Sequence, residues 1–243
     1  MWLKLTKNYS PNFNPSKRLK KKIKFIIIHY TGMKSEKLAI KRLTDLKFKV
    51  SSHYFIKKNG NIIQLVPDLY EAWHAGESSW KKLNSLNKYS IGIEIQNSGH
   101  DYGNENFSFK QIKSLKILLK DLIKNYNIDY KNVLGHSDIA PDRKKDPGEK
   151  FPWKYFSKFK LAYWHNLDQK KLKKLRLKKL TLKEESQLLK NLSKFGYKVL
   201  RSSNKKNYTK NLLIAFQQRF RQSLVNGLMD KECFIISKNL IKS

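Results

Sequence analysis

The feature that most constrains the fold of this chain is a continuous apolar run within Lys24–Tyr30 (KFIIIHY). A run of this length without alternation is typical of a strand that is buried on both faces of a sheet. A second segment, Ser90–Gln96 (SIGIEIQ), alternates strictly between isoleucine and small or polar residues, which indicates another strand. The chain is therefore expected to build a sheet around these two segments.

Helix and hairpin patterns lie between and after these strands. Lys34–Leu46 predicts a short helix, and apolar residues at helical spacing predict a long amphipathic helix over about 108–126. Asn59-Gly60 lies between two strand-like segments and predicts a β-hairpin with a type I′ turn. Because strands and helices alternate in this way, the predicted fold class is α/β: a mixed central β-sheet flanked by helices, with a small all-helical C-terminal domain.

Four segments are expected along the chain: an N-terminal arm, the sheet-containing domain, a basic linker and the helical domain, at residues 1–23, 24–165, 166–180 and 181–243. In the arm, Pro11 and Pro15 oppose regular structure. At the start of the helical domain, Thr181 and Glu184 match a helix-capping box, and Gly196 predicts the end of that helix.

Basic residues dominate the charge, with 52 lysines and arginines against 19 acidic residues and a formal net charge of +33. Such a balance is common in nucleic-acid binders, which makes that class an alternative function. However, only seven of the basic residues are arginine, the residue that reads guanine edges, and no nucleic-acid-binding motif occurs. We therefore expect no specific nucleic-acid partner. The densest basic run, residues 170–179, is a linker or a surface that contacts an anionic cell wall or membrane.

Two histidines follow short apolar runs. His29 ends the first predicted strand, and His136 follows Val133-Leu134-Gly135. Functional residues of α/β proteins gather at such strand ends. A catalytic zinc needs three protein ligands and leaves a fourth position for water. Spacing alone leaves the third ligand open among four residues: Asp146, Asp138, Asp142 and His53.

Glu94 is unusual for a strand residue. The isoleucines of its strand share one face, so Glu94 shares the other face with Gly92. A carboxylate behind a residue without a side chain is typical of the floor of a site, where it would act as a general base near a metal-activated water. The alternative is an ordinary exposed sheet face.

Five motifs occur in a fixed order: IIIHYTG (Ile26–Gly32), VSSHYFI (Val50–Ile56), AWHAG (Ala72–Gly76), SIGIEIQN (Ser90–Asn97) and GHSDIAPDRKKDPGEKFPW (Gly135–Trp153). Together they resemble the zinc-dependent N-acetylmuramoyl-L-alanine amidases of type 2, a family related to peptidoglycan recognition proteins, and in particular its AmpD/AmiD-like branch. The resemblance covers about residues 20–160, so that residues 24–165 would be the catalytic domain. Residues 181–243 resemble the branch's helical module, which is similar to peptidoglycan-binding domains.

The resemblance implies roles for five residues. One Zn²⁺ per chain would be held by His29, His136 and Asp146, which selects Asp146 as the third ligand. Glu94 would be the catalytic acid and base. Lys144, two residues before Asp146, would stabilise the oxyanion.

Four further residues are candidates for substrate contact. Trp73 and His74 match a motif that lines the cleft in the family, and Tyr30 lies at the edge of the expected site. His53 is a weaker candidate. For both His53 and His74, a packed structural role is the alternative.

The implied function is hydrolysis of the amide bond between N-acetylmuramic acid, or its 1,6-anhydro form, and L-alanine of the stem peptide. The partners would be peptidoglycan or muropeptides, and the process cell-wall turnover and recycling. An inactive peptidoglycan-recognition protein is the alternative, against which the intact ligand and base residues speak. The first 24 residues lack an apolar signal core, so we expect a cytoplasmic location, with the periplasm or cell envelope as the alternative.

The helical domain is expected to add a second contact to polymeric wall. Removal of residues 181–243 is then expected to weaken wall binding and to spare turnover of a small muropeptide.

Overall fold

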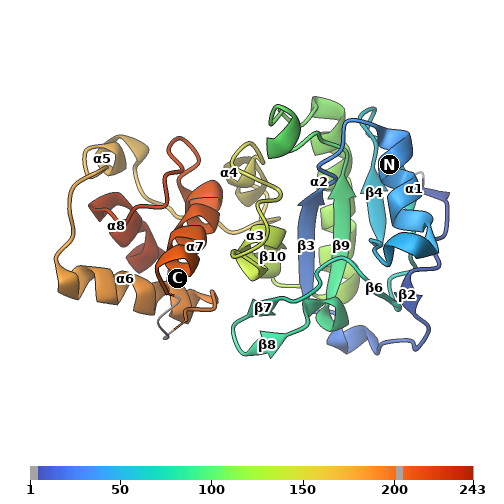
Figure 1. Ribbon diagram of the computed structural model, residues 1–243, viewed down its shortest axis with the longest axis horizontal. Coiled ribbons are helices and arrows are strands. Elements are labelled where there is room, and N and C mark those ends of the chain that lie inside the picture. Colours follow the sequence, from blue (N-terminus) through green and yellow to red (C-terminus); the bar gives the residue numbers. More distant parts are fainter. Residues whose placement is uncertain (1–4, 201–204, 243) are drawn as a thin grey trace.

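The structure, a computed structural model, describes residues 5–200 and 205–242. A six-stranded mixed sheet forms the centre of the larger body (Figure 1). In the described part of the chain, β4 and β5 are its one antiparallel pair. The predicted α/β class is confirmed. The strands, in spatial order, are β1 (Leu5–Lys7), β5 (Ile62–Gln64), β4 (Tyr54–Ile56), β9 (Ser90–Ile95), β3 (Phe25–Tyr30) and β10 (Val133–Gly135).

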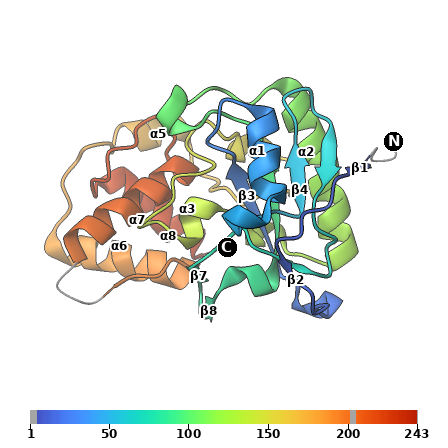
Figure 2. The ribbon, with the colours of Figure 1, turned by 45° about the vertical axis from the view of Figure 1, so that its right-hand side comes forward.

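Alternate side chains of β3 enter two different cores, whereas β9 contributes its isoleucines to one of them. Ile26 and Ile28, with the isoleucines of β9, pack against α2 (Phe109–Tyr126) on one face. The opposite face is covered on one side by α1 (Glu36–Thr44) and on the other by α3 (His136–Ile139) and the C-terminal helices (Figure 2). The candidate site lies on this second face, between its two covers.

The remaining elements are short. They are β2 (Phe13–Asn14), β6 (Glu71–Ala72), β7 (Ser79–Trp80), β8 (Leu83–Asn84), α4 (Trp153–Ser157) and 3-10 helices at Lys20–Lys22, Leu46–Phe48, Leu86–Tyr89, His100–Tyr102 and Tyr130–Asn132. Within the described ranges, the structure contains no helix whose length and hydropathy would suit a membrane span.

The hairpin between β4 and β5 is confirmed, but its turn is not type I′. The amide of Gly60 donates to the carbonyl of Lys57, and the amide of Lys57 donates to the carbonyl of Asn61, so the loop has three residues. Gly60 has a φ of +86°, whereas Asn59 is not left-handed. This is the pattern of a type I turn followed by a bulged glycine. A Cβ at Gly60 would lie 2.7 Å from the carbonyl oxygen of Lys110, so the packing of α2 also requires glycine there.

The N-terminal arm is more regular than predicted. β1 adds a parallel edge strand to β5, and β2 pairs with β6. Pro11 and Pro15 lie outside both strands, so their missing amides interrupt neither ladder. The arm also buries Arg18, whose guanidinium donates to backbone carbonyls under the sheet, at Asn87, Ser90 and Asp68.

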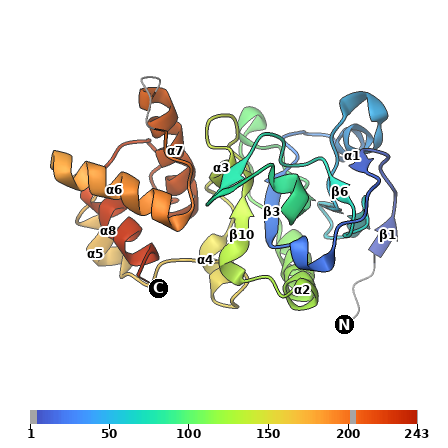
Figure 3. The same cartoon turned by 90° about the horizontal axis from the view of Figure 1, so that it is seen from below.

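The C-terminal helices form a second body, called the helical unit below. It consists of α5 (Gln169–Lys173), α6 (Leu182–Phe195), α7 (Lys205–Phe220) and α8 (Lys231–Leu240). The capping box at Thr181 and the end of α6 at Gly196 are confirmed. One apolar cluster runs from Phe25 and Ile27 of β3 through α3 into this unit, which lies against the β10 edge of the sheet (Figure 3).

The segment predicted as a basic linker, residues 166–180, folds against the other helices of the helical unit. It contains α5, whose Leu172 is 2% exposed and belongs to the same apolar cluster. Further along, Arg176 pairs with Glu232 of α8. The sequence did not predict these contacts, because leucines interspersed among many lysines fit an exposed linker as well as a packed helix. The boundaries of the four segments stay a prediction.

Candidate active site

Three buried side chains meet at one edge of the sheet. His29 lies on β3, His136 begins α3 directly after β10, and Asp146 lies in the loop that follows α3. The parallel register pairs Ile28 with Gly135, so the two histidines that come next lie side by side. The amide of Ser137 donates to the carbonyl of Asp146 over 2.8 Å, which holds the loop against α3.

The ligand atoms of these residues form a nearly equilateral triangle. Nδ1 of His29 lies 2.9 Å from Nδ1 of His136, and Oδ2 of Asp146 lies 3.0 and 3.1 Å from these two nitrogens. Around a tetrahedral zinc with bonds near 2.0 Å, ligand atoms are separated by roughly 3.3 Å. The three residues therefore fit a zinc ion with one position left open.

Nε2 of His136, the ring nitrogen that faces away from the triangle, contacts a backbone carbonyl. Nε2 lies 3.1 Å from the oxygen of Ala75, to which only an N–H can donate. The proton is thereby assigned to Nε2, and Nδ1 keeps its lone pair toward the centre of the triangle. Metal-binding histidines are commonly oriented by such a contact.

A longer chain of hydrogen bonds assigns the tautomer of His29. The Ser90 hydroxyl donates to the carbonyl of Leu86 over 2.6 Å, so it accepts from Nε2 of His74 at 3.2 Å. Nδ1 of His74 is then an acceptor for Nε2–H of His29 at 3.1 Å. The lone pair of His29 Nδ1 therefore also points into the triangle.

Gly92 makes room for this chain. A Cβ at Gly92 would lie 2.4 Å from the ring of His74, closer than any side chain tolerates. The glycine that the sequence places beside Glu94 therefore serves the packing of the imidazole that supports His29.

The charge states of the ligands suit metal binding. Burial, and next the neighbouring His136, lower the pKa of His29 to about 4, so its imidazole is neutral near pH 7. Burial by itself would raise the pKa of Asp146, but its proximity to His136, and next to His29, holds that pKa far below its ordinary value. A neutral imidazole and an ionised carboxylate are the forms that bind metals.

Glu94 pairs with His29 in the register of β9 and β3. It lines a cleft that opens beside the three ligand residues. Its Oε2 is buried and has no hydrogen-bond partner among the described residues. Burial, and next the charge of Asp146, raise the pKa of its carboxyl well above the ordinary value, whereas Lys144 lowers it. A buried carboxyl with a free oxygen and a displaced pKa is suited to proton exchange with water or substrate.

A cleft of about 580 Å³ opens over these groups. Its walls come from α1, from the loop that carries Asp146 and from residues around Trp73. The predicted residues that line it are Tyr30, Trp73, His74, Glu94, Lys144, His136 and Asp146. The Tyr30 hydroxyl lies 2.8 Å from Nδ1 of His100, whose Nε2 lies 2.9 Å from Glu149.

His53 lies below the floor of the cleft and not in its lining. Its Nδ1 accepts from the amide of Gly92 over 3.0 Å, and its Nε2 contacts the carbonyl of Tyr70 at 3.0 Å. Burial, and next the charge of Arg18, lower its pKa to about 3. These contacts fit the packed structural role that is the alternative for His53, and the substrate contact at His53 stays a prediction.

The other two competitors for the third ligand position also lie elsewhere. Asp138 turns away from the triangle, because its Oδ2 accepts from the amide of Gly135 over 2.8 Å. Asp142 is exposed. Within the described ranges, the metal-like cluster consists of His29, His136 and Asp146.

Two supporting residues were missed by the sequence analysis. Arg143 donates to the carbonyls of Ala75 and Glu77 and so ties the Asp146 loop to the segment that supports His136. Ser90 fixes His74 as described. Their roles depend on backbone carbonyls, which leave no trace in a sequence motif.

The N-acetylmuramoyl-L-alanine amidase family, Amidase_2, matches residues 19–149 of this chain. The chain belongs to this family. The resemblance predicted from the five motifs is thereby confirmed. In this amidase, the contacts described above orient the three candidate metal ligands.

Relatives extend the match beyond the sheet. AmiD of Escherichia coli K12 is 35% identical over 233 residues, which cover 91% of this chain and 83% of AmiD. A solved structure of AmiD superposes with a TM-score of 0.80 at 33% identity and covers 94% of this amidase and 91% of that chain. AmpDH3 from Pseudomonas aeruginosa gives a TM-score of 0.79 at 31% identity, with 94% of both chains covered.

AmpD of Escherichia coli K12 matches a smaller part. It is 40% identical over 110 residues, which cover 44% of this chain and 57% of AmpD. The AmiD and AmpDH3 similarities therefore include the helical unit, whereas the AmpD similarity is confined to a part of the chain.

Proposed function

We propose that this amidase binds one Zn²⁺ through His29, His136 and Asp146 and cleaves the bond between N-acetylmuramic acid and L-alanine. The observation that carries the proposal is the triangle of ligand atoms, 2.9 to 3.1 Å apart, beside the unpartnered Oε2 of Glu94. Zinc bound there would polarise the amide carbonyl and lower the pKa of water to about 7.

The residues around the triangle divide the remaining work. Glu94 accepts a proton from the attacking water at its free oxygen and donates it to the departing alanine nitrogen. Lys144 stabilises the negative charge that develops on the carbonyl oxygen. His74 and the carbonyl of Ala75 keep the two imidazoles in the required tautomers.

The 1,6-anhydro form of the sugar is included in the proposed substrate class. A structure of AmiD is a complex with anhydro-N-acetylmuramic acid-L-Ala-D-γ-Glu-L-Lys, and one of AmpDH3 contains an anhydromuramic pentapeptide. The cleft also suits a peptide with free carboxylates, because four cationic side chains line it: Arg42, Arg143, Lys144 and Lys145. The cytoplasmic location stays a prediction.

The test uses anhydro-N-acetylmuramic acid-L-Ala-D-γ-Glu-L-Lys and mass spectrometry of the products. We expect two products, the anhydro sugar acid and the intact tripeptide, formed by the zinc-loaded protein, lost after chelation and restored by zinc. An uncleaved but bound substrate would support the inactive recognition protein instead. Full activity after removal of all metal would contradict the zinc part alone.

A further inference from the structure

A buried ion pair joins the helical unit to the segment that carries His136. Nη1 of Arg219 on α7 donates to Oδ2 of Asp138, and both side chains are 1% exposed. Nη2 of the same guanidinium donates to the carbonyl of Val133 over 3.0 Å. Arg219 therefore binds the chain on both sides of His136, at the last strand before it and at the helical turn after it.

The Asp138 carboxylate receives further donors. Its Oδ2 accepts from the amide of Gly135 over 2.8 Å, and its Oδ1 accepts from the hydroxyl of Tyr197. Tyr197 is 2% exposed and follows α6, so two of the three residues that bind this carboxylate come from the C-terminal part of the chain. A buried charge held by this many donors has little freedom to move.

The chain just after α7 also holds the loop after Asp146. Nε2 of Gln222 donates to the carbonyls of Glu149 and Phe151, both over 2.6 Å. Gln222 lies two residues after the last residue of α7, close to Arg219 in the chain. The C-terminal end of α7 and the residues after it thus contact both segments that supply ligands after β10.

We propose that Arg219, together with Tyr197, positions His136 for metal binding, so that the helical unit is a structural part of the zinc site. The inference rests on the zinc site proposed above. It replaces the expectation that residues 181–243 are separable from turnover of small substrates. Their removal would leave the Asp138 carboxylate without its two side-chain partners and would expose the apolar side chain of Ile139 on α3.

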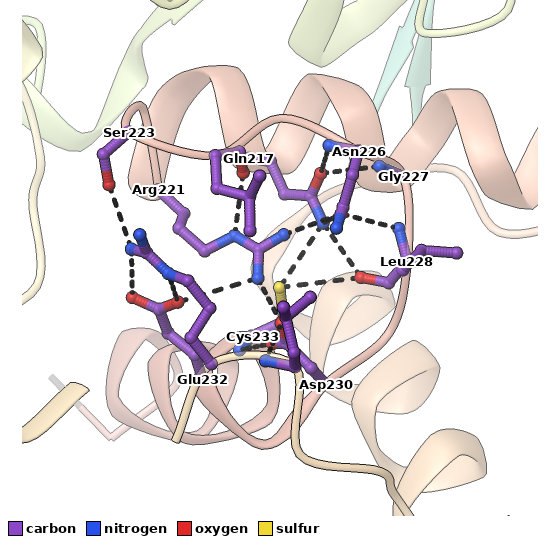
Figure 4. A network of polar contacts seen from close by, with 12 residues as sticks. Gln217, Arg221, Ser223, Asn226, Gly227, Leu228, Asp230, Glu232 and Cys233 are labelled. Atoms are coloured by element: carbon purple, nitrogen blue, oxygen red, sulfur yellow. Dashed lines mark hydrogen bonds and ion pairs between the residues drawn. The ribbon is translucent and has the colours of Figure 1, made fainter. Parts of the chain in front are cut away.

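Arg221 provides a matched control on the same stretch of chain. Its side chain is also 1% exposed and pairs with Asp230 and Glu232 of the helical unit (Figure 4). Glu232 also binds Arg176. Among the described contacts of Arg221, none reaches the segment from Val133 to Asp146. Loss of Arg221 therefore disturbs the helical unit without touching the ligands directly.

The experiment measures the zinc dissociation constant of the full chain by competition with a chromophoric chelator, together with the melting temperature. We expect Arg219→Met to weaken zinc binding by about 10-fold or more, as removal of supporting contacts commonly does. Arg219→Lys should recover part of the loss. Arg221→Met should leave the zinc dissociation constant within about threefold of wild type, even if its melting temperature falls as much as that of Arg219→Met.

Two results would overturn the proposal: an unchanged zinc constant in Arg219→Met, or an equal loss in Arg221→Met. Should Arg219→Met fail to fold, Tyr197→Phe tests the proposal instead, because it removes one hydroxyl and leaves the ion pair of Arg219 and Asp138 in place. Its zinc constant should rise by about 2- to 5-fold, and an unchanged value would refute the proposal. A wild-type protein that binds no zinc would instead overturn the proposed function, and this inference with it.

Discussion

His74 is not one of the three ligands, yet its hydrogen bonds decide which nitrogen His29 presents. Replacement of His74 by alanine removes the acceptor for Nε2–H of His29, so the zinc dissociation constant should rise by about 10- to 100-fold. His74→Asn places an amide oxygen near the former Nδ1 and should retain most of the affinity. The zinc constants of both variants check this, and equal losses would show that the ring's bulk, not its acceptor, supports His29.

At the residue scale, the sequence predicts the histidines and Glu94 but not the contacts that orient them. Strand ends and a period of two are local patterns, and they place His29, His136 and Glu94 correctly. The partner of Asp138 is 81 residues away, at Arg219. No spacing rule connects two such residues, so spacing alone leaves Asp138 in competition with Asp146, and only the family resemblance separates them.

At the scale of elements, long periodic segments were predictable and short irregular ones were not. β3, β9 and α2 follow their patterns because burial of the strands, and of one face of the helix, dictates where apolar residues lie. β1 was missed because an edge strand of three exposed residues has no such pattern. The turn at Gly60 was assigned the wrong type because the dipeptide allows two turn geometries and the packing of α2 selects one.

The basic segment around α5 keeps its lysines exposed although it packs on the other helices of the helical unit. Lys171, Lys174 and Lys179, changed together to glutamine, should weaken binding to purified sacculi by about 3- to 10-fold at 0.05 M salt. At 0.5 M salt the difference should vanish, because the screening length falls from about 14 to about 4 Å.

The control for this prediction removes the same charge from α2. Lys113, Lys120 and Lys124 are exposed there, on the opposite side of the sheet from the site. Their replacement by glutamine should change sacculus binding by less than about twofold. Equal effects of the two triple variants would show that net charge acts, and not the location of the segment.

At the scale of the whole molecule, buried neutral histidines make stability depend on pH. Burial lowers the pKa of His53 to about 3 and that of His165 to about 4, whereas an unfolded histidine titrates near 6.5. Below pH 6.5 the unfolded chain takes up protons that the folded chain does not. The stabilisation is therefore complete above pH 6.5 and declines as the pH falls toward 4 and 3.

Urea unfolding of the metal-free protein at pH 7.5 and 5.5 measures this effect. The free energy of unfolding should fall by about 1 kcal/mol for each of the two histidines. Glu149 does not contribute in this window. Its hydrogen bond with His100 lowers its pKa to about 2, so the stabilisation that the ionised carboxylate provides is lost only below about pH 4.5. His165→Gln should reduce the pH dependence relative to wild type, a comparison in which the other titrating groups cancel, and an unchanged pH dependence in this variant would contradict the assignment.

The central claim is that Glu94 moves the proton while Asp146 holds the metal, and one paired measurement separates the two roles. Metal content by plasma mass spectrometry is determined beside initial rates on the anhydromuramyl peptide. Asp146→Ala should lose zinc and activity together. Glu94→Gln should retain close to one zinc per chain and lose on the order of 10²–10⁴ in rate. A Glu94→Gln rate within about threefold of wild type, or loss of its zinc, would contradict the account.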